Sequence, residues 1–150
     1  ICNLAGQMLK VVTEDAVYEQ LASLGPDAMD DPFPEEEITE RLMGLRLPIA
    51  EALLDQSVVA GIGNIAKSEI LFSAGIDPRA KVSELGDGEM PRLLEAIQET
   101  LWASYNNGGR WKCSVYRKAG EACVQCGGAI RSIKQPPSRR TTYFCPRCQK

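Results

Sequence analysis

Near its C-terminal end the chain reads Cys123-Val124-Gln125-Cys126, continues for 18 residues, and then reads Cys145-Pro146-Arg147-Cys148. Two Cys-x-x-Cys hooks at this separation can place four thiolates around one tetrahedral Zn²⁺, with Zn–S distances of about 2.3 Å. Because the chain has no histidine, a four-cysteine site is the ordinary zinc site that it can build. We therefore expect one structural Zn²⁺, with a hairpin between the hooks, held by Cys123, Cys126, Cys145 and Cys148.

Two other uses of these cysteines remain open. A pair of disulfides would suit a secreted protein, but cysteines two residues apart do not favour internal bridges, and no signal peptide is evident in the sequence. Iron in a rubredoxin-like site is the second alternative. With four cysteines on a metal, we expect a reducing cytoplasm, and Cys2 and Cys113 as free thiols.

The formal net charge of −3 hides a sharp division along the chain. Residues 105–150 hold ten Lys/Arg against one acid, whereas residues 1–104 hold seven against nineteen. A basic zinc hairpin on an acidic helical body is typical of a protein that binds a polyanion. A solvated charged surface is the alternative. No apolar run approaches the length of a membrane span, so we expect no membrane partner.

Local signals predict a mainly α chain with a small β zinc hairpin. Residues 1–12 alternate enough to form a strand, and Thr13 can cap a short helix that ends before Gly25-Pro26. A Pro/Asp-rich linker follows, after which Pro34 and Pro48 each open a helix. Further helices are expected over residues 65–73 and 88–105.

The turn Gly61-Ile62-Gly63-Asn64 precedes one of these helices. Its glycines permit a tight turn, and Asn64 can cap the helix, which is the simplest interpretation. Such a turn also offers backbone N–H groups, a side-chain amide and the positive end of the helix dipole to a phosphate. Periodicity predicts that Lys67 and Ser68 face outward, where Lys67 either contacts phosphate or is simply solvated.

Several short motifs occur along the chain in a fixed order. They are Leu24-Gly25-Pro26-Asp27, Leu53-Leu54-Asp55-Gln56, Gly61-Ile62-Gly63-Asn64-Ile65, Lys67-Ser68-Glu69-Ile70-Leu71-Phe72, Val115-Tyr116-Arg117-Lys118-Ala119-Gly120 and Thr142-Tyr143-Phe144-Cys145-Pro146-Arg147-Cys148-Gln149. This ordered set resembles the formamidopyrimidine-DNA glycosylase/endonuclease VIII family, and the resemblance covers nearly the whole chain from about Leu4. No single motif would suffice to establish it.

The resemblance implies a helix–two-turn–helix domain followed by a Cys₄ zinc finger, both binding double-stranded DNA that is damaged or abasic. It divides the chain into the end of a truncated N-terminal β-sandwich domain (1–25), a linker (26–34), the helix–two-turn–helix domain (35–109) and the zinc finger (110–150). We expect a monomer in a bacterial-type cytoplasm, associated with the nucleoid through DNA.

The same resemblance assigns DNA contacts to Gly63 and Asn64 on the glycine-rich turn and to Arg140 on the hairpin tip, with Lys67 as a further candidate. Arg140 occupies the position of the family's zinc-finger arginine, a bidentate phosphate holder. Arg139 stands where the family usually has glycine, so it is the more natural choice for a plain surface arginine.

The family's chemistry uses an N-terminal proline amine as nucleophile and a following glutamate as acid/base. Ile1-Cys2 does not match them, so we expect no catalytic residue in this chain and DNA binding without cleavage. The full-length parent is expected to be a bifunctional DNA glycosylase/AP lyase for oxidised bases in base excision repair. Ala50 and the short segment 106–115 favour an endonuclease VIII-like branch acting on pyrimidines. The alternatives are a non-catalytic nucleic-acid-binding zinc ribbon and a rubredoxin-like electron carrier.

Overall fold

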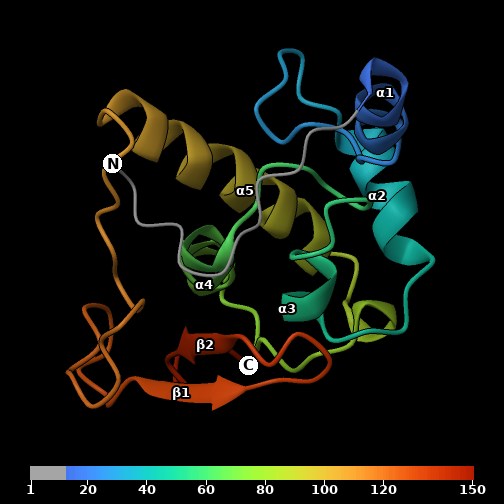
Figure 1. The fold of residues 1–150 in the computed structure, drawn as a ribbon. Helices are drawn as coiled ribbons and strands as arrows, with labels where there is room; N and C mark the ends of the chain where they lie inside the picture. The colour runs from blue at the N-terminus through green and yellow to red at the C-terminus, as the bar shows by residue number, and fades with distance from the viewer. Residues whose placement is uncertain (1–12) are drawn as a thin grey trace.

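The computed structural model describes residues 13–150, which form five α-helices, a short 3-10 helix and one two-stranded antiparallel sheet (Figure 1). The predicted fold class, mainly α with a small β-hairpin, is therefore confirmed. The expected strand in residues 1–12 lies outside the described residues. Below, residues 26–109 are called the helical body and residues 110–150 the zinc finger.

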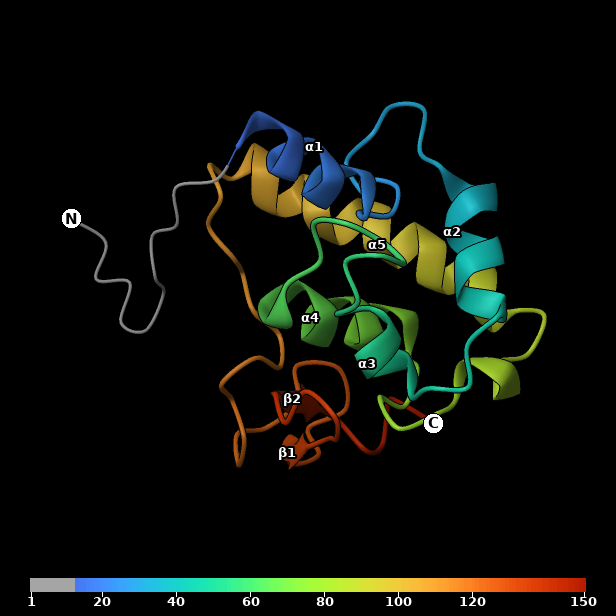
Figure 2. The same cartoon turned by 45° about the vertical axis from the view of Figure 1, so that its right-hand side comes forward.

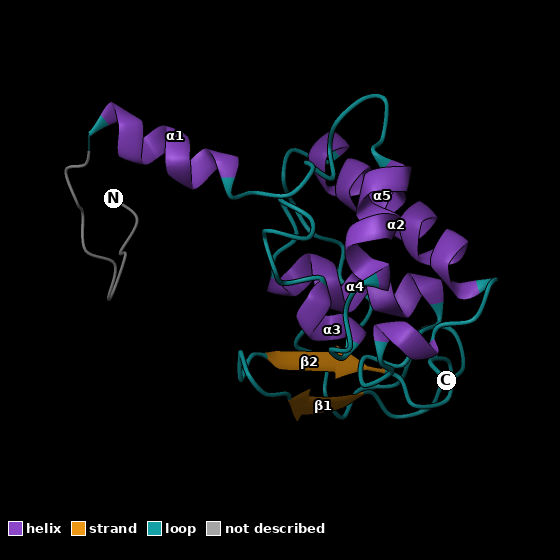
Figure 3. Cartoon of the chain, turned by 90° about the vertical axis from the view of Figure 1, so that its right-hand side faces the viewer, coloured by secondary structure: helices purple, strands orange, loops and turns teal. Residues whose placement is uncertain are grey.

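Helix α1, Glu14–Ala22, begins as predicted at Thr13, whose hydroxyl oxygen accepts a hydrogen bond from the Ala16 N–H at 3.4 Å. None of its residues is buried. Figure 3 shows α1 standing apart from the other helices. This helix therefore adds little to the hydrophobic core of the described chain.

Prolines precede the next two helices, as the sequence predicts. Helix α2, Glu35–Met43, follows Pro34 and carries three glutamates in its first turn, where they complement the helix dipole. Helix α3, Ile49–Ala52, follows Pro48. A fixed proline φ suits the beginning of a helix, which explains why both starts could be read from the sequence.

Helix α4, Asn64–Ala74, lies at the centre of the fold, between α5, Glu89–Asn106, and the β-hairpin (Figures 1 and 2). Both of its sides are covered, and every residue from Ala66 to Phe72 is buried. The prediction that Lys67 and Ser68 face outward is therefore wrong. The prediction from periodicity supposed that only one side of α4 is covered by the protein. In the structure α5 covers one side and the hairpin covers the other.

The short 3-10 helix η1, Val82–Glu84, joins α4 to α5. Strands β1, Arg131–Lys134, and β2, Thr141–Phe144, pair so that Arg131 faces Phe144 and Lys134 faces Thr141. Strand β2 is the one that contacts α4. Alternation along β2 buries Thr142 and Phe144, so a polar threonine lies against the helix.

The buried apolar residues fall into two clusters. The larger lies within the helical body and runs in sequence from Ala28 to Leu101. The smaller belongs to the zinc finger except for Phe72 of α4, and consists of Phe72, Val115, Cys123, Ile130 and Cys145. Over residues 13–150, no helix is both long and apolar enough to cross a bilayer.

Candidate nucleic-acid interface and metal centre

The four cysteines of the two hooks come together at one point. Their sulfur atoms all lie within 4.8 Å of one another, with Cys123 Sγ 3.8 Å from Cys148 Sγ and Cys126 Sγ 3.5 Å from Cys145 Sγ. A tetrahedron with Zn–S bonds of about 2.3 Å has sulfur–sulfur edges of about 3.8 Å. The donor set and its spacing therefore fit one structural Zn²⁺.

Tight turns shape each hook for this purpose. The Gly127 N–H donates to the Cys123 carbonyl at 2.9 Å, and Gly127 adopts a positive φ of 69°, which a side chain would disfavour. The Gly128 N–H points at Cys126 Sγ, 3.4 Å away. In the second hook the Cys148 N–H donates to the Cys145 carbonyl at 3.2 Å. Such N–H groups stabilise thiolate ligands.

Polar side chains attach the zinc finger to the helical body. The carboxylate of Glu69 on α4 accepts backbone N–H groups from Ser114, Val115 and Tyr116 at 2.6–3.0 Å. Gln149 accepts from the Cys145 N–H at 2.8 Å and donates to the Ile76 carbonyl at 2.9 Å. These bonds fix the metal hooks relative to α4.

The glycine-rich turn before α4 is closed by Gln56. Its Oε1 accepts the Gly61 N–H at 3.1 Å, and its Nε2 donates to the Ile62 carbonyl at 3.0 Å. Gly61 has a φ of 92°, a conformation that favours glycine. A Cβ placed on Gly63 would meet no atom within 4 Å, so the space in front of the helix is open. A ligand can therefore approach this backbone closely.

The start of α4 differs from the prediction. Gly63 occupies the cap position and Asn64 is the first helical residue, so Asn64 does not cap the helix with its side chain. Its Nδ2 donates instead to the Thr141 carbonyl of the hairpin at 3.1 Å. Gly63 leaves the N-terminal N–H groups without a side-chain cap, and such groups attract anions.

Lys67 is fully buried behind Asn64. Its Nζ donates to Asn64 Oδ1 and to Thr142 Oγ1, both at 2.8 Å. Burial lowers the pKa of Lys67 to about 8; Glu51 opposes this shift, and Arg140 adds to it. The lysine thus joins α4 to β2 with a positive charge held inside the protein.

Arg140 is exposed at the hairpin tip, beside a loop anchored to α3. The buried carboxylate of Glu51 accepts the Ser138 N–H at 3.1 Å and the Ser138 hydroxyl at 2.8 Å. The Ser138 hydroxyl in turn accepts the Arg140 N–H at 3.2 Å. Arg139 has a φ of 53°, so it retains the left-handed turn geometry that a glycine at this position would favour.

The turn before α4 and the hairpin tip line an open depression of about 390 Å³. The sequence-predicted residues Gly63, Asn64 and Arg140 all line it, together with Leu54, Gln56, Ile62 and Ser138. Lys67 does not line it. The fold therefore brings the Asn64 amide, the Arg140 guanidinium and a helix N-terminus without a side-chain cap to a single concave surface.

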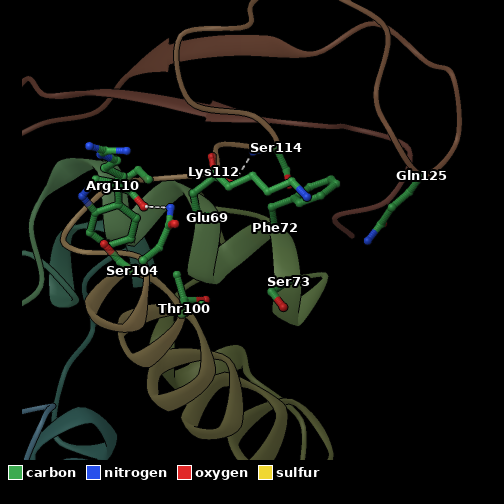
Figure 4. A pocket seen from close by; sticks show the side chains of 12 residues that line it. Glu69, Phe72, Ser73, Thr100, Ser104, Arg110, Lys112, Ser114 and Gln125 are labelled. Carbon is green, nitrogen blue, oxygen red and sulfur yellow. Dashed lines mark hydrogen bonds between the residues drawn. The ribbon is translucent and has the colours of Figure 1, made fainter.

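A second concavity, of about 420 Å³, lies between α4, α5 and the segment that leads into the zinc finger (Figure 4). Glu69 and Ser73 of α4 line it opposite Thr100 and Ser104 of α5. Neither Asn64 nor Arg140 belongs to its lining. Cys113 lies in sequence between the lining residues Lys112 and Ser114, and it is half-buried. The pKa of its thiol is raised, mainly by burial.

The sequence-predicted site residues did not include three residues at or behind the depression: Gln56, which lines it, and Glu51 and Thr142, which bind Ser138 and Lys67. Gln56 carries a detectable signal, because an amide five residues before a glycine can close a turn. Glu51 and Thr142 act through partners 87 and 75 residues away, respectively. No local pattern predicts such contacts.

Two family models match the chain. The Formamidopyrimidine-DNA glycosylase H2TH domain matches residues 24–113, and the zinc finger found in FPG and IleRS matches residues 120–150. The first covers the Asn64 turn and the second covers Arg140 and all four cysteines. The two matches therefore cover both halves of the depression and the metal site.

Curated relatives agree with these matches. The formamidopyrimidine-DNA glycosylase of Acidiphilium cryptum is 39% identical over 95% of this chain and 58% of its own length. That of Edwardsiella ictaluri is 35% identical over 90% of this chain and 55% of its own length. The chain thus spans about half the length of the curated relatives it matches.

Solved structures show the same fold. The Lactococcus lactis Fpg bound to DNA with an abasic site superposes with a TM-score of 0.82 at 31% identity, covering 93% of this chain and 57% of that one. MutM in complex with DNA containing carbocyclic 8-oxo-G gives a TM-score of 0.82 at 33% identity, covering 93% and 56%. These relatives do not confirm the expected endonuclease VIII-like branch. The chain belongs to the formamidopyrimidine-DNA glycosylase family, of which it carries the H2TH domain and the zinc finger.

Proposed function

We propose that this chain binds the phosphate backbone of double-stranded DNA at the depression between the helical body and the zinc finger. The observation that carries the proposal is that Asn64 and Arg140, from separate regions, line one concave surface. The adjoining N-terminus of α4 has no side-chain cap. An amide, a guanidinium and free backbone N–H groups are suitable donors for a phosphate.

Each candidate contact has a distinct role in this proposal. Gly63 allows the phosphate to approach the backbone, because the space that a side chain would occupy at this position has no neighbouring atom within 4 Å. Asn64 donates an amide N–H, and Arg140 supplies a bidentate charge-assisted contact. Lys67 contributes its positive charge from behind the surface rather than as a solvated surface lysine. All four act on phosphate, so they confer affinity without base preference.

We further propose that the parent protein is a bifunctional DNA glycosylase/AP lyase of base excision repair, and that residues 1–150 bind DNA without cutting it. The solved relatives are described as complexes with abasic or oxidised DNA, which supports a damaged-DNA partner. We match no residue here to the family's N-terminal proline and glutamate. Borohydride trapping on an abasic duplex tests this, because a covalent adduct would reveal a usable amine.

The domain division and the substrate branch also belong to this proposal. We assign residues 26–34 to a linker, 35–109 to the helix–two-turn–helix domain and 110–150 to the zinc finger; the β-sandwich expected over residues 1–25 includes residues 1–12, which lie outside the described residues. Ala50 and the short segment 106–115 support a preference for oxidised pyrimidines. If fusing these residues to a catalytic N-terminal domain gave strong 8-oxoguanine preference, the branch assignment would be wrong.

The direct test is a titration of the zinc-loaded chain with an abasic-analogue duplex and with its undamaged counterpart, at two salt concentrations. We expect tighter binding to the abasic duplex and a steep loss of affinity with salt. Arg140→Ala should reduce the slope of log affinity against log salt by about 0.9, the contribution of one phosphate. Equal binding to double-stranded RNA would instead favour a general nucleic-acid-binding zinc ribbon.

A further inference from the structure

Lys67 is an unusual charge in this fold. It is fully buried, and none of the ion pairs among residues 13–150 includes it. Its Nζ contacts the uncharged oxygens of Asn64 and Thr142, each at 2.8 Å. Burying an unpaired ammonium is costly, so a protein that keeps one has a use for the charge or for its hydrogen bonds.

The charged groups around Lys67 do not neutralise it. Glu51 of α3 favours its charged form, but the Glu51 carboxylate is already bound by Ser138. Arg140 of the hairpin disfavours the charged form. On α4 the Glu69 carboxylate accepts three N–H groups of the zinc finger. Helix α5 has no charged residue among its buried side chains. The ammonium of Lys67 is therefore held by uncharged acceptors, with no carboxylate of the described chain at ion-pair distance.

The hydrogen bond from Lys67 also fixes the orientation of the Asn64 amide. An ammonium can only donate, so the Asn64 atom that faces it must be the oxygen. Nδ2 then faces away from the lysine and uses one hydrogen for the Thr141 carbonyl at 3.1 Å. Its second hydrogen has no partner in the described chain and is available at the surface that Asn64 lines.

We propose that Lys67 is a positioning residue for the DNA-phosphate site: it locks the Asn64 amide with an N–H available to the depression and places a buried positive charge behind it. This inference rests on the proposed function, since it assumes that an anion binds there. It assigns Lys67 a role through Asn64 and through its field, without direct contact between its side chain and DNA.

The arrangement couples DNA binding to the protonation of Lys67. A bound phosphate favours the charged lysine, so affinity should be highest at neutral pH and fall as pH rises through about 8, the pKa of Lys67 in the free chain. Folding should show the opposite trend. Because the folded pKa lies below the ordinary lysine value of 10.5, the unfolded chain binds more protons between these values, and the free energy of unfolding rises with pH there.

Fluorescence anisotropy with an abasic-analogue duplex, at constant ionic strength from about pH 7 to about pH 9, tests the inference. If DNA binding raises the Lys67 pKa by one unit, the affinity should fall about tenfold as the pH rises past both pKa values. Lys67→Met keeps the chain length but removes the donor and the charge. We expect this variant to bind about tenfold more weakly at neutral pH and to show no pH dependence.

Lys81→Met is the matched control, because Lys81 is exposed and pairs with Glu84 at 2.9 Å, away from the depression. It should retain wild-type affinity and its pH dependence. Should Lys67→Met fail to fold, calorimetry of the wild type at about pH 8, in buffers of different ionisation enthalpy, gives the answer. Uptake of up to about half a proton on DNA binding is expected.

The outcomes separate this inference from the proposed function. If the wild type binds no duplex at neutral pH, both fail. If it binds DNA with a pH-independent affinity and takes up no proton, the phosphate site stands and the role of Lys67 is refuted. A folded Lys67→Met variant with wild-type affinity and pH dependence would refute that role equally.

Discussion

The helical body and the zinc finger hold their structures by different means. The body buries a continuous apolar cluster from Ala28 to Leu101, drawn entirely from its own helices and turns. The finger has a cluster of five residues, of which two are cysteines of the metal hooks and one, Phe72, belongs to the body. A segment with so little apolar burial needs a metal and a docking surface. We therefore expect the body to stay folded without the finger, and the finger to depend on both zinc and the body.

Removing the metal should have the largest effect, and it should affect the zinc finger much more than the helical body. Zinc binding of about 10–16 kcal/mol in such sites is largely folding free energy, so a chelator should unfold the finger. The helices should persist, because their cluster includes no cysteine. Tyr143 and Tyr116, which meet edge-to-face at 5.2 Å, provide a near-ultraviolet dichroism signal for the finger. Loss of the entire helical far-ultraviolet signal at the same chelator concentration would contradict the two-part account.

Phe72→Ala should have the next largest effect, because this side chain links the two regions. Removing a buried phenylalanine costs about 3–5 kcal/mol, and here the cost should appear as weaker zinc affinity and easier unfolding of the finger. Phe33→Ala is the control, since Phe33 packs on the cluster of the body. It should lower the melting temperature of the helices and leave zinc affinity unchanged. Equal effects of the two variants on zinc affinity would remove the distinction.

Glu69→Gln should have an intermediate effect. The carboxylate accepts three backbone N–H groups of the finger, and a neutral amide offers only one oxygen. Hydrogen bonds to charged groups contribute about 1.5–3 kcal/mol, so we expect the finger to lose about 2 kcal/mol of stability in chemical denaturation. Glu84→Gln, at an exposed position, should change stability by less than about 0.5 kcal/mol. A similar loss of stability in both variants would contradict the role of Glu69 in attaching the finger to the body.

Arg139→Gly should have the smallest effect and the opposite sign. The residue holds a φ of 53°, which costs a non-glycine residue about 1 kcal/mol, partly offset by the greater freedom of glycine in the unfolded chain. We expect the zinc-loaded finger to gain about 0.5 kcal/mol. Arg131→Gly, within strand β1, is the control and should destabilise the finger. A loss of stability in Arg139→Gly would mean that its side chain contributes more than its backbone costs.

Local signals predicted the parts of this structure that depend on neighbouring residues. Pro34 and Pro48 fix the beginnings of α2 and α3, and Thr13 caps α1, because each acts within one turn of the chain. The metal site could likewise be predicted from the sequence, because the spacing of the four cysteines is typical of a tetrahedral site.

The errors arose where distant segments meet. Periodicity placed Lys67 outward, but Thr142 lies against it from 75 residues away. Asn64 was expected as a helix cap, yet its amide bonds to Thr141, 77 residues along the chain. Both errors have one physical cause, because the hairpin covers a side of α4 that the helix sequence by itself marks as polar. Gly63, Asn64 and Arg140 do line one depression, but the contacts that hold them there were not predicted, and their binding to DNA stays a prediction.

In the proposed function, the two regions jointly form one phosphate site, although they are stabilised differently. A double-mutant cycle with Asn64→Ala and Arg140→Ala, measured as affinity for an abasic-analogue duplex, tests it most directly. Residues that hold the same phosphate should be coupled by about 1 kcal/mol or more, so the double variant should bind more tightly than the sum of the single losses predicts. Additive losses, within about 0.3–0.5 kcal/mol, would place the two residues on separate contacts and contradict the shared site.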